Sequence, residues 1–358
     1  AASLEDGAVV VYIRELREHY GFSTETGEYM WGPTPSEHYL NALEDSPSAV
    51  RHIAYGNLYS ASIGGEVYCY DVLTGEVEWT YQVTDPYSEM LWSNNWWVKP
   101  LFITDGKIYV AHTEHSAVDP RPRGAPFVCI DAMTGEEIWR IDGAFRTTRW
   151  GGRAIIGDSI IVGMDTYDQQ IYAVGKGPSA LTAQAPMSGV TVGSSVQITG
   201  TIMDVSPGTQ DYSLMARFPN GVPAIADEDM SAWMLHVYKQ FEEPMVNGVE
   251  VILGAIDPNG NYMDIDRTTS DMYGNWALSF KPEMEGTYQI IATFEGSDAY
   301  YASTTSTYVT VDPAPAVSTP IDNEPVDNEP VDNNEPTDVS FITTEVAIIA
   351  AVAVAAVI

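Results

Sequence analysis

The sequence predicts an all-β protein in two folded parts, an array of small antiparallel sheets followed by a β-sandwich. The first part repeats one strand–turn–strand unit: VYCYDVLTGEVEW at residues 67–79 returns as FVCIDAMTGEEIW at residues 127–139, and a weaker copy, YGFSTETGEYMW, lies at residues 20–31. Repetition of one unit at long, uneven spacing marks an array of sheets. In the second part, short runs alternate between apolar and polar residues and are separated by dense turn signals, which is typical of a sandwich.

In the repeat region, residues 1–180, the strands are expected to come in antiparallel pairs. Its first strand is expected at residues 8–13, AVVVYI, before the first Thr-Gly-Glu unit. Three later segments read as two short strands around a hairpin turn, at residues 52–61, 101–111 and 154–163. We place these turns at Gly56-Asn57, Asp105-Gly106 and Gly157-Asp158. The last unit closes at residues 170–174 without Thr-Gly-Glu and Trp, as expected for a terminal repeat.

This unit resembles the blades of PQQ-like β-propellers, the quinoprotein-type repeat in which a tryptophan of one blade docks on the next. The resemblance implies two sets of structural residues, namely the turn glycines Gly27, Gly75 and Gly135 and the docking tryptophans Trp31, Trp79 and Trp139. The region holds about three and a half blades, whereas a closed propeller has about four to eight. We expect further blades upstream, or a second chain, to complete the ring, and we favour the upstream blades.

The resemblance also raises the question of quinone chemistry. Quinoprotein dehydrogenases with this repeat hold PQQ with a vicinal cysteine pair, a calcium ion bound by carboxylate and amide groups, and an aspartate base. The chain has no adjacent cysteines, and no residue matches those roles. We therefore expect no catalytic or cofactor-binding residue, and keep PQQ and calcium as the less favoured alternative. Cys69 and Cys129 hold equivalent places in two repeats and are expected to be buried, unpaired packing residues.

Residues 181–311 form the predicted sandwich, with strands expected at residues 190–202, 249–256, 276–280, 286–294 and 306–311. Its second half resembles the Ig-like domains of prokaryotic surface proteins, on a hairpin motif at Asp271, Gly274 and Trp276 and a strand motif at Gly286 and Tyr288. An insertion at residues 226–240 has an acidic start and apolar residues at spacings of three and four, which predicts a helix. Its apolar stripe is expected to pack on the sandwich or the propeller, and docking of a partner is the alternative.

One loop of the sandwich resembles a calcium site. Asp257, Asn259 and Asn261 match the first three ligand positions of a calcium loop, but Thr268 stands where the twelfth ligand, a glutamate, belongs. We therefore favour an ordinary tight turn and keep the three residues as the less favoured metal candidates.

Two further clusters fall in expected loops of the repeat region. His112 and His115, with Asp119, could share a metal ion only if a turn intervenes, because residues three apart on a strand point to opposite faces. We favour a polar loop on the propeller rim. The aromatic and amide side chains of residues 92–97, WSNNWW, suit sugar or partner binding, and packing between blades explains them equally well.

The C-terminal region has a different composition. Residues 312–338 repeat Asp, Asn, Glu and Pro without a basic residue, which predicts an extended, disordered acidic stalk. Residues 339–358 form the predicted apolar helix and end in thirteen uncharged apolar residues, VAIIAAVAVAAVI. Because a bilayer-spanning helix takes about 20 residues, we interpret the segment as a truncated transmembrane anchor, with an oligomerisation helix as the alternative.

Charge and the order of the parts narrow the function. Sixteen basic against 50 acidic residues give a net charge of −34, which disfavours binding to nucleic acid. The order of propeller, Ig-like domain, stalk and apolar helix resembles an archaeal PQQ-like repeat protein of the cell envelope. This resemblance implies a non-catalytic cell-surface protein, anchored in the cytoplasmic membrane by its C-terminus, that binds other envelope proteins or copies of itself, or builds a surface lattice or filament. The alternatives are a PQQ-dependent dehydrogenase with its catalytic blades upstream and a soluble assembly scaffold.

Overall fold

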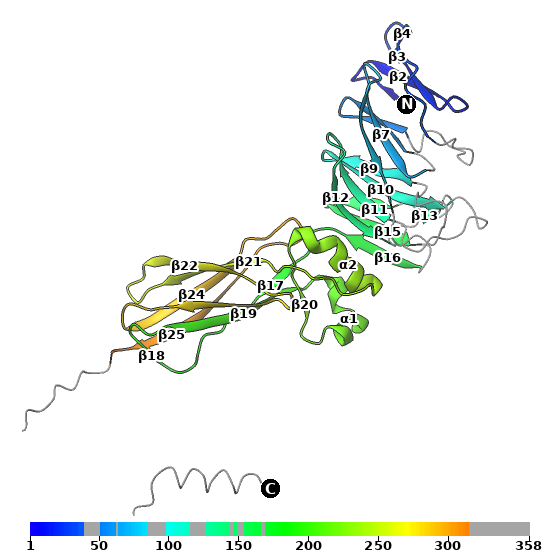
Figure 1. The fold of residues 1–358 in the computed structure, drawn as a ribbon. Helices are drawn as coiled ribbons and strands as arrows, with labels where there is room; N and C mark the ends of the chain where they lie inside the picture. The colour runs from blue at the N-terminus through cyan, green and yellow to red at the C-terminus, as the bar shows by residue number, and fades with distance from the viewer. Residues whose placement is uncertain are drawn as a thin grey trace, which may run out of the picture. The chain divides into compact units, whose positions relative to one another are not determined.

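Four antiparallel sheets follow one another along the first half of the chain (Figure 1). The computed structural model describes residues 1–38, 51–61, 64–84, 98–114, 126–142, 147–148, 154–165 and 169–314.

We call the four sheets blades 1 to 4. Blade 1 holds β1 (Ala2–Ser3), β2 (Ala8–Ile13), β3 (Glu18–Ser23) and β4 (Tyr29–Trp31). Blade 2 holds β5 (Arg51–Ala54), β6 (Asn57–Ala61), β7 (Glu66–Asp71) and β8 (Val77–Gln82). Blade 3 holds β9 (Val98–Thr104), β10 (Lys107–Glu114), β11 (Pro126–Asp131) and β12 (Glu137–Asp142), with β13 (Thr147–Thr148) paired in parallel to β10. Blade 4 holds β14 (Ile155–Gly157), β15 (Ile160–Asp165) and β16 (Gln170–Val174).

The hairpin turns that open blades 2, 3 and 4 are two-residue loops with both residues at positive φ. The prediction of Asp105-Gly106 is confirmed, with φ of 53° and 66°. The other two predictions are wrong by one residue, because the turns fall at residues 55–56 and 158–159. Strand pairing decides the register, and tight hairpins whose twist matches the strands need positive φ at both central positions. Tyr55 adopts this conformation, with φ of 55°. Its hydroxyl oxygen receives a hydrogen bond from the N–H of Gly106 at 3.0 Å.

Apolar clusters close each boundary between neighbouring blades. Between blades 1 and 2 the cluster contains Ala8, Val10, Trp31, Leu58, Tyr70 and Val72. Between blades 2 and 3 it contains Tyr59, Cys69, Val98, Ile108, Val110, Val128 and Ile130, among others. Between blades 3 and 4 it contains Ala111, Phe127, Ala154 and Ile161. Each blade thus has a forward face, turned to the following blade, and a backward face, turned to the preceding one.

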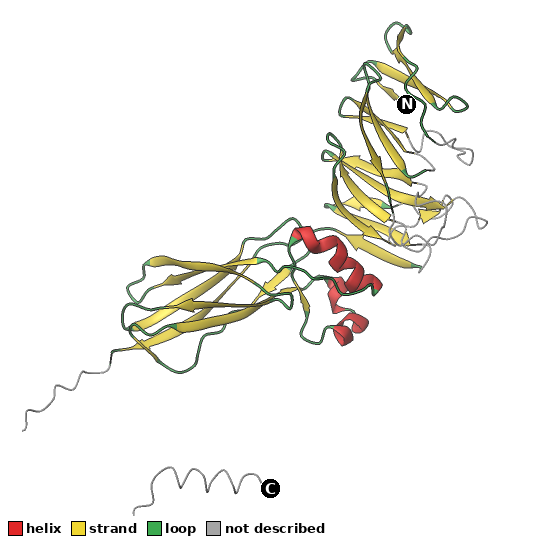
Figure 2. Ribbon diagram, viewed as in Figure 1, coloured by secondary structure: helices red, strands yellow, loops and turns green. Residues whose placement is uncertain are grey.

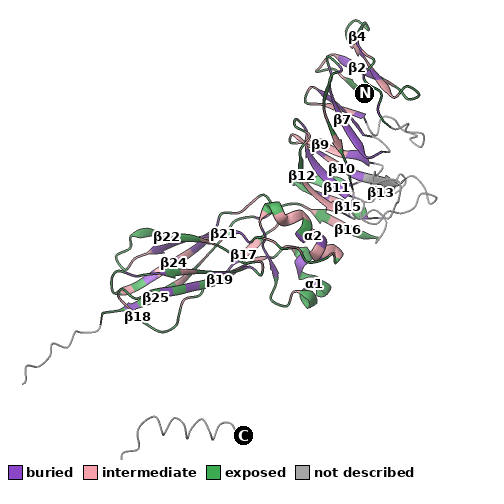
Figure 3. Cartoon of the chain, in the orientation of Figure 1, coloured by how far each residue is buried: buried purple, intermediate pink, exposed green. Residues whose placement is uncertain are grey.

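Two sheets packed face to face form the sandwich. One sheet has the order β18 (Val190–Thr191), β25 (Ser303–Asp312), β24 (Gly286–Phe294), β21 (Glu250–Ile256) and β22 (Tyr262–Thr269). In the other, β19 (Val196–Asp204) pairs with β17 (Ser179–Leu181), β20 (Val222–Pro223) and β23 (Asn275–Phe280). The buried side chains of both sheets form one core, and Figure 3 shows buried residues along the strands of the sandwich.

The predicted strand at residues 190–202 is wrong as a single strand. β18 pairs in parallel with β25 in one sheet, whereas β19 pairs with β23 in the other. Gly193, at φ +82°, lies between them, and the hydroxyl groups of Thr191 and Ser194 bond across the turn at 2.8 Å. A period-two pattern continues through such a change of sheet, because both segments bury alternate residues in the same core.

Helices gather at one end of the sandwich (Figure 2). Between β19 and β20 lie η2 (Pro207–Gln210) and α1 (Tyr212–Arg217), neither of which was predicted. The helix predicted at residues 226–240 is confirmed as η3 (Asp227–Asp229) and α2 (Met230–Lys239). Arg217 ties the two helices together, since its guanidinium donates to the carbonyls of Val237 and His236 at 2.8 and 3.0 Å.

Residues Ala1–Ala314 form one compact unit. The predicted boundary between residues 180 and 181 therefore stays a prediction. The predicted anchor and almost all of the predicted stalk lie outside the described residues. Within the described ranges, no helix combines the length and the apolar character that crossing a membrane requires.

Candidate functional site

The first docking contact joins blade 1 to blade 2. Trp31, at the end of β4, packs on Gly75, where an added Cβ would lie 2.3 Å from the indole ring. The indole N–H donates to the carbonyl of Val72 at 2.9 Å. Gly75 has φ +73°, so it is required both by the backbone of the turn and by the indole lying against it.

The second docking contact repeats the first between blades 2 and 3. Trp79, on β8, packs on Gly135, where an added Cβ would lie 2.6 Å from the ring. Its N–H donates to the carbonyl of Ala132 at 3.2 Å, and the hydroxyl of Tyr59 donates to the same oxygen at 3.0 Å. Trp31 and Trp79 thus make equivalent contacts, each with the turn glycine of the following blade.

Gly27 and Trp139 differ from the other members of the motif. Gly27 has the same backbone conformation, φ +72°, but an added Cβ would meet no heavy atom within 4 Å. Trp139 packs against Phe127 of its own blade, with ring centroids 5.2 Å apart, and borders the apolar cluster between blades 3 and 4. Blade 4 has no Thr-Gly-Glu turn to receive it.

The two cysteines lie on strands β7 and β11, each directly opposite a tryptophan of the blade motif. Cys69 pairs with Trp79 and Cys129 with Trp139 across the strands. Both thiols are free and fully buried, and burial raises the pKa of each to about 12. Such thiols are packing groups and poor nucleophiles. The prediction of buried, unpaired cysteines is confirmed.

A buried polar cluster lies at the junction of blades 1 and 2. His19 on β3, Glu37 after β4 and Arg51 on β5 are each at most 6% exposed. The Nε of Arg51 donates to Nε2 of His19 at 3.2 Å, and Nη2 of Arg51 lies 3.7 Å from Oε2 of Glu37. The guanidinium also lies 3.4 Å from the ring centroid of Tyr12. The cluster joins the two blades through charge, beside the apolar contact of Trp31.

Electrostatics in this cluster follow from burial. Burial lowers the pKa of His19 to about 3, with the Arg51 cation as a further cause, so the imidazole is neutral at physiological pH. Burial also raises the pKa of Glu37, while hydrogen bonds and Arg51 act in the opposite direction. Sequence reasoning missed this cluster, because its members are scattered over a strand, a connection and the next strand without a local motif.

Helix α2 attaches to blades 3 and 4. The backbone N–H of Arg140, on β12, donates to the hydroxyl oxygen of Ser231 at 3.2 Å. The Nζ of Lys239 bonds the hydroxyl of Tyr172 at 2.5 Å and lies 3.5 Å from the buried carboxylate of Asp165. On its other side, the helix buries Trp233 and Val237 in one apolar cluster with Leu214 of α1, Val222 of β20 and the nearby Ile225. The prediction that the apolar stripe of this helix packs on the sandwich or the propeller is confirmed, because β20 belongs to the sandwich.

The calcium-like loop is a tight turn in the structure. One carboxylate oxygen of Asp257 receives the N–H groups of Asn259 and Asn261, both at 2.8 Å, and the side-chain amide of Asn261 donates to the other oxygen at 3.0 Å. The amide of Asn259 donates instead to the sulfur of Met284 at 3.4 Å. These hydrogen bonds lower the pKa of Asp257. The carboxylate is thus occupied by its own loop, which is the arrangement of an Asx turn.

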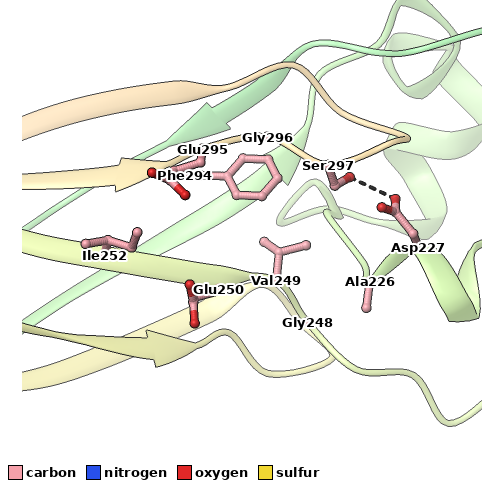
Figure 4. Close-up of a pocket in the computed structure, with 10 residues that line it drawn as sticks. All are labelled: Ala226, Asp227, Gly248, Val249, Glu250, Ile252, Phe294, Glu295, Gly296 and Ser297. Carbon is pink, nitrogen blue, oxygen red and sulfur yellow. Dashed lines mark hydrogen bonds between the residues drawn. The ribbon is translucent and has the colours of Figure 1, made fainter.

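A hollow of about 240 Å³ lies at the sandwich edge, between the ends of β21 and β24 (Figure 4). Two of its three acidic side chains have partners: Glu250 is ion-paired with Arg267 at 2.9 Å, and Asp227 accepts a hydrogen bond from the hydroxyl of Ser297 at 2.8 Å. Its volume is below the roughly 300–1,000 Å³ of typical small-molecule sites. We do not assign it a ligand.

Two predicted clusters escape description. The backbone of His112 belongs to β10, whereas His115, Asp119 and residues 92–97 lie outside the described residues. In the described ranges, no group of three or more His, Cys, Asp or Glu side chains is placed to hold a metal ion.

Repeated small antiparallel blades, two of whose boundaries hold a tryptophan docked on a glycine turn, define the class of the protein as a propeller-type repeat protein. The sequence profile of the family described as outer membrane protein assembly factor BamB matches residues 17–271. The chain belongs to this family. The match begins in blade 1 and extends past blade 4 into the sandwich, as far as the turn at Asp271.

Solved structures with similar folds are distant from this chain. BamB from Moraxella catarrhalis is 10% identical, with a TM-score of 0.27, over 76% of this chain and 79% of that one. Quinohemoprotein alcohol dehydrogenase from Comamonas testosteroni is 14% identical, with a TM-score of 0.28, over 84% of this chain and 38% of the enzyme. Quinohemoprotein alcohol dehydrogenase ADHIIG from Pseudomonas putida HK5 is 16% identical, with a TM-score of 0.27, over 38% of this chain and 19% of the enzyme. No curated protein matches the chain.

Proposed function

We propose that this chain is a non-catalytic cell-surface protein whose blades and Ig-like sandwich bind other proteins. The observation that carries the proposal is the use of the blade motif. Trp31 packs on Gly75 and Trp79 packs on Gly135. The indole N–H of each tryptophan donates a hydrogen bond to a backbone carbonyl of the next blade. The motif therefore builds an array of stacked sheets, and fold alone does not imply the chemistry of other members.

Membership of a family described as an outer membrane protein assembly factor supports a role in binding other proteins. The partners we propose are other envelope proteins or further copies of the chain. The net charge of −34 argues against nucleic acid as a partner. We propose no catalytic residue and no cofactor.

The proposed attachment to the cytoplasmic membrane rests on the sequence after the sandwich. Residues 312–338 are acidic and rich in proline, which suits a stalk, and residues 346–358 are uncharged and apolar. Detergent phase partitioning of the 358-residue chain and of a version ending at residue 338 tests the anchor. We expect the full chain in the detergent phase and the shortened chain in the aqueous phase. If both remain in the aqueous phase, the anchor is refuted.

Reconstitution with PQQ and calcium tests the non-catalytic assignment. The protein is incubated with both, and dye reduction is measured on alcohols and sugars, with a quinoprotein alcohol dehydrogenase as the positive control. We expect no turnover above the rate of PQQ and calcium alone. Turnover that requires the protein would refute the proposal and support the dehydrogenase alternative.

A further inference from the structure

Two exposed tyrosines lie in one row on the outer face of the five-stranded sheet of the sandwich (Figure 1). The row crosses four neighbouring strands and consists of Tyr308 on β25, Gln289 on β24, Ile256 on β21 and Tyr262 on β22, each paired with the next. Tyr308 is 60% exposed and Tyr262 is 61% exposed. The row faces away from the core, because Val309, the next residue along β25, points the other way and is buried in the core.

A glycine fixes where the ring of Tyr262 lies. Gly254, on β21, belongs to the adjacent row of the same outer face, where it pairs with Ile291 and Asp264. A Cβ added to Gly254 would lie 2.3 Å from the hydroxyl oxygen of Tyr262 and 2.7 Å from two of its ring carbons. The outer end of the ring therefore leans over the backbone of β21, in space that the missing side chain leaves open. Because Tyr262 is 61% exposed, the side of its ring turned away from the sheet reaches solvent.

The two aromatic rings are spaced and surrounded in a way that suits a sugar chain. The ring of Tyr262 leans over β21, and β25 lies two strands away, so the rings are about 10 Å apart. Gln289 lies between them, and the exposed Ser306 and Thr310 lie on either side of Tyr308 along β25. A pyranose ring has an apolar C–H face, which stacks on an aromatic ring, and a rim of hydroxyls, which bond to amide and hydroxyl groups.

Charge and polarity narrow the ligand further. No side chain of the tyrosine row is charged. On the neighbouring rows, Arg267 and Glu250 form an ion pair at 2.9 Å, which leaves the carboxylate of Asp264. This carboxylate and the net charge of −34 oppose an anionic chain, whereas a neutral chain meets no such repulsion. The exposed neighbours of Tyr308 along β25 on this face are serine and threonine, which favour a sugar over the apolar centre of a stable protein interface.

We propose that this face of the sandwich binds an extended neutral polysaccharide. Two of its sugar residues stack on Tyr262 and Tyr308, and Gln289, Ser306 and Thr310 bond to its hydroxyls. An extended, ribbon-like chain suits the site, because an open sheet face has two stacking positions in a line and no enclosing walls. The inference goes beyond the binding of proteins proposed above, since it gives the sandwich a ligand of a different chemical class.

Affinity electrophoresis of the 358-residue chain, in native gels with and without a soluble polysaccharide, tests the proposal. Hydroxyethyl cellulose and galactomannan are the neutral probes, and polygalacturonate is the anionic comparison. At least one neutral probe should retard the unchanged chain, and polygalacturonate should not. Tyr262→Ala and Tyr308→Ala should each weaken binding about tenfold. Tyr273→Ala, the matched control, should bind like the unchanged chain, because Tyr273 is 62% exposed but lies between β22 and β23, away from the row.

Gly254→Ala tests the placement of the ring while both tyrosines are kept. The new Cβ meets only the free end of the Tyr262 side chain, which can swing away without moving the backbone, so the variant should fold normally and still bind more weakly. Near-ultraviolet circular dichroism and urea denaturation establish that the variants are folded.

Three results overturn the proposal. They are no retardation by either neutral probe, retardation by polygalacturonate alone, and tyrosine variants that bind as tightly as the unchanged chain. A protein partner whose binding is weakened by Tyr262→Ala, in a chain that neither neutral probe retards, also overturns it, because the face would then be a protein interface.

Discussion

Replacing the turn glycines one at a time by alanine separates the backbone role of each glycine from its docking role. Gly27 and Gly75 occupy equivalent turns, with φ of +72° and +73°. Alanine in this conformation costs about 1 kcal/mol at either position. At Gly75 the new Cβ would also lie 2.3 Å from the ring of Trp31, whereas at Gly27 nothing lies within 4 Å. Overpacking of this kind adds about 1–3 kcal/mol.

We therefore expect Gly27→Ala to destabilise the protein by about 1 kcal/mol and Gly75→Ala by about 2–4 kcal/mol. Gly135→Ala should match Gly75→Ala, because its Cβ would lie 2.6 Å from the ring of Trp79. Urea denaturation followed by tryptophan fluorescence measures the three losses. Equal losses at Gly27 and Gly75 would show that the indole does not lie on the turn, and would refute the docking geometry.

Three further predictions concern buried groups. Arg51→Met should lower the free energy of unfolding, measured by thermal unfolding, by about 3–5 kcal/mol, because it leaves Glu37 buried without its cation. Adding Glu37→Gln to this variant should restore part of the loss. Absence of any recovery would contradict the ion pair. The pKa of His19 is about 3 in the folded protein and has an ordinary value of 6.5. Between these two pH values the imidazole of the unfolded chain is protonated and that of the folded chain is neutral. The free energy of unfolding should therefore fall as pH drops from 6.5 towards 3, by up to about 1.4 kcal/mol per pH unit. Between pH 7 and pH 5, the urea midpoint should decline less for His19→Gln than for the unchanged chain. Equal declines in the two proteins would argue against a neutral buried imidazole. Glu37, whose raised pKa affects stability with the opposite sign, is present in both proteins. Cys69 and Cys129 should resist a thiol reagent at pH 8 in the folded protein and both react in urea, whereas rapid labelling of the folded chain would show that the thiols are accessible.

Local signals predicted most of the strands and the turns between them. In the Thr-Gly-Glu turns of blades 2 and 3, the aspartate before the turn accepts hydrogen bonds from backbone N–H groups two and three residues later, so the turn is specified within its own sequence. The helix at residues 226–240 was predictable for the same reason, because its acidic start and apolar spacing are local. The register of the hairpins at residues 55–56 and 158–159 was not, since it depends on which residues pair across the strands.

The buried cluster of His19, Glu37 and Arg51 could not be predicted. A histidine on a strand, a glutamate in a connection and an arginine on another strand have no spacing that distinguishes them from solvated side chains. Only the packing of blade 1 on blade 2 removes water from all three side chains and shifts the pKa values of His19 and Glu37. The change of sheet near Gly193 was hidden for a related reason, because both strands face one core.

The sequence by itself determined that the chain is all-β, that its first part is a repeat of blades, and that glycine and tryptophan are the structural residues of the repeat. These conclusions depend on alternation and turn chemistry, which act over a few residues. The tertiary structure decided which tryptophan meets which turn: Trp31 bonds to a carbonyl 41 positions away, Trp79 to one 53 positions away, and Gly27 receives no indole in the described structure. Stacking of separate sheets makes those contacts, because each indole lies on a turn of the next blade, far away in the sequence.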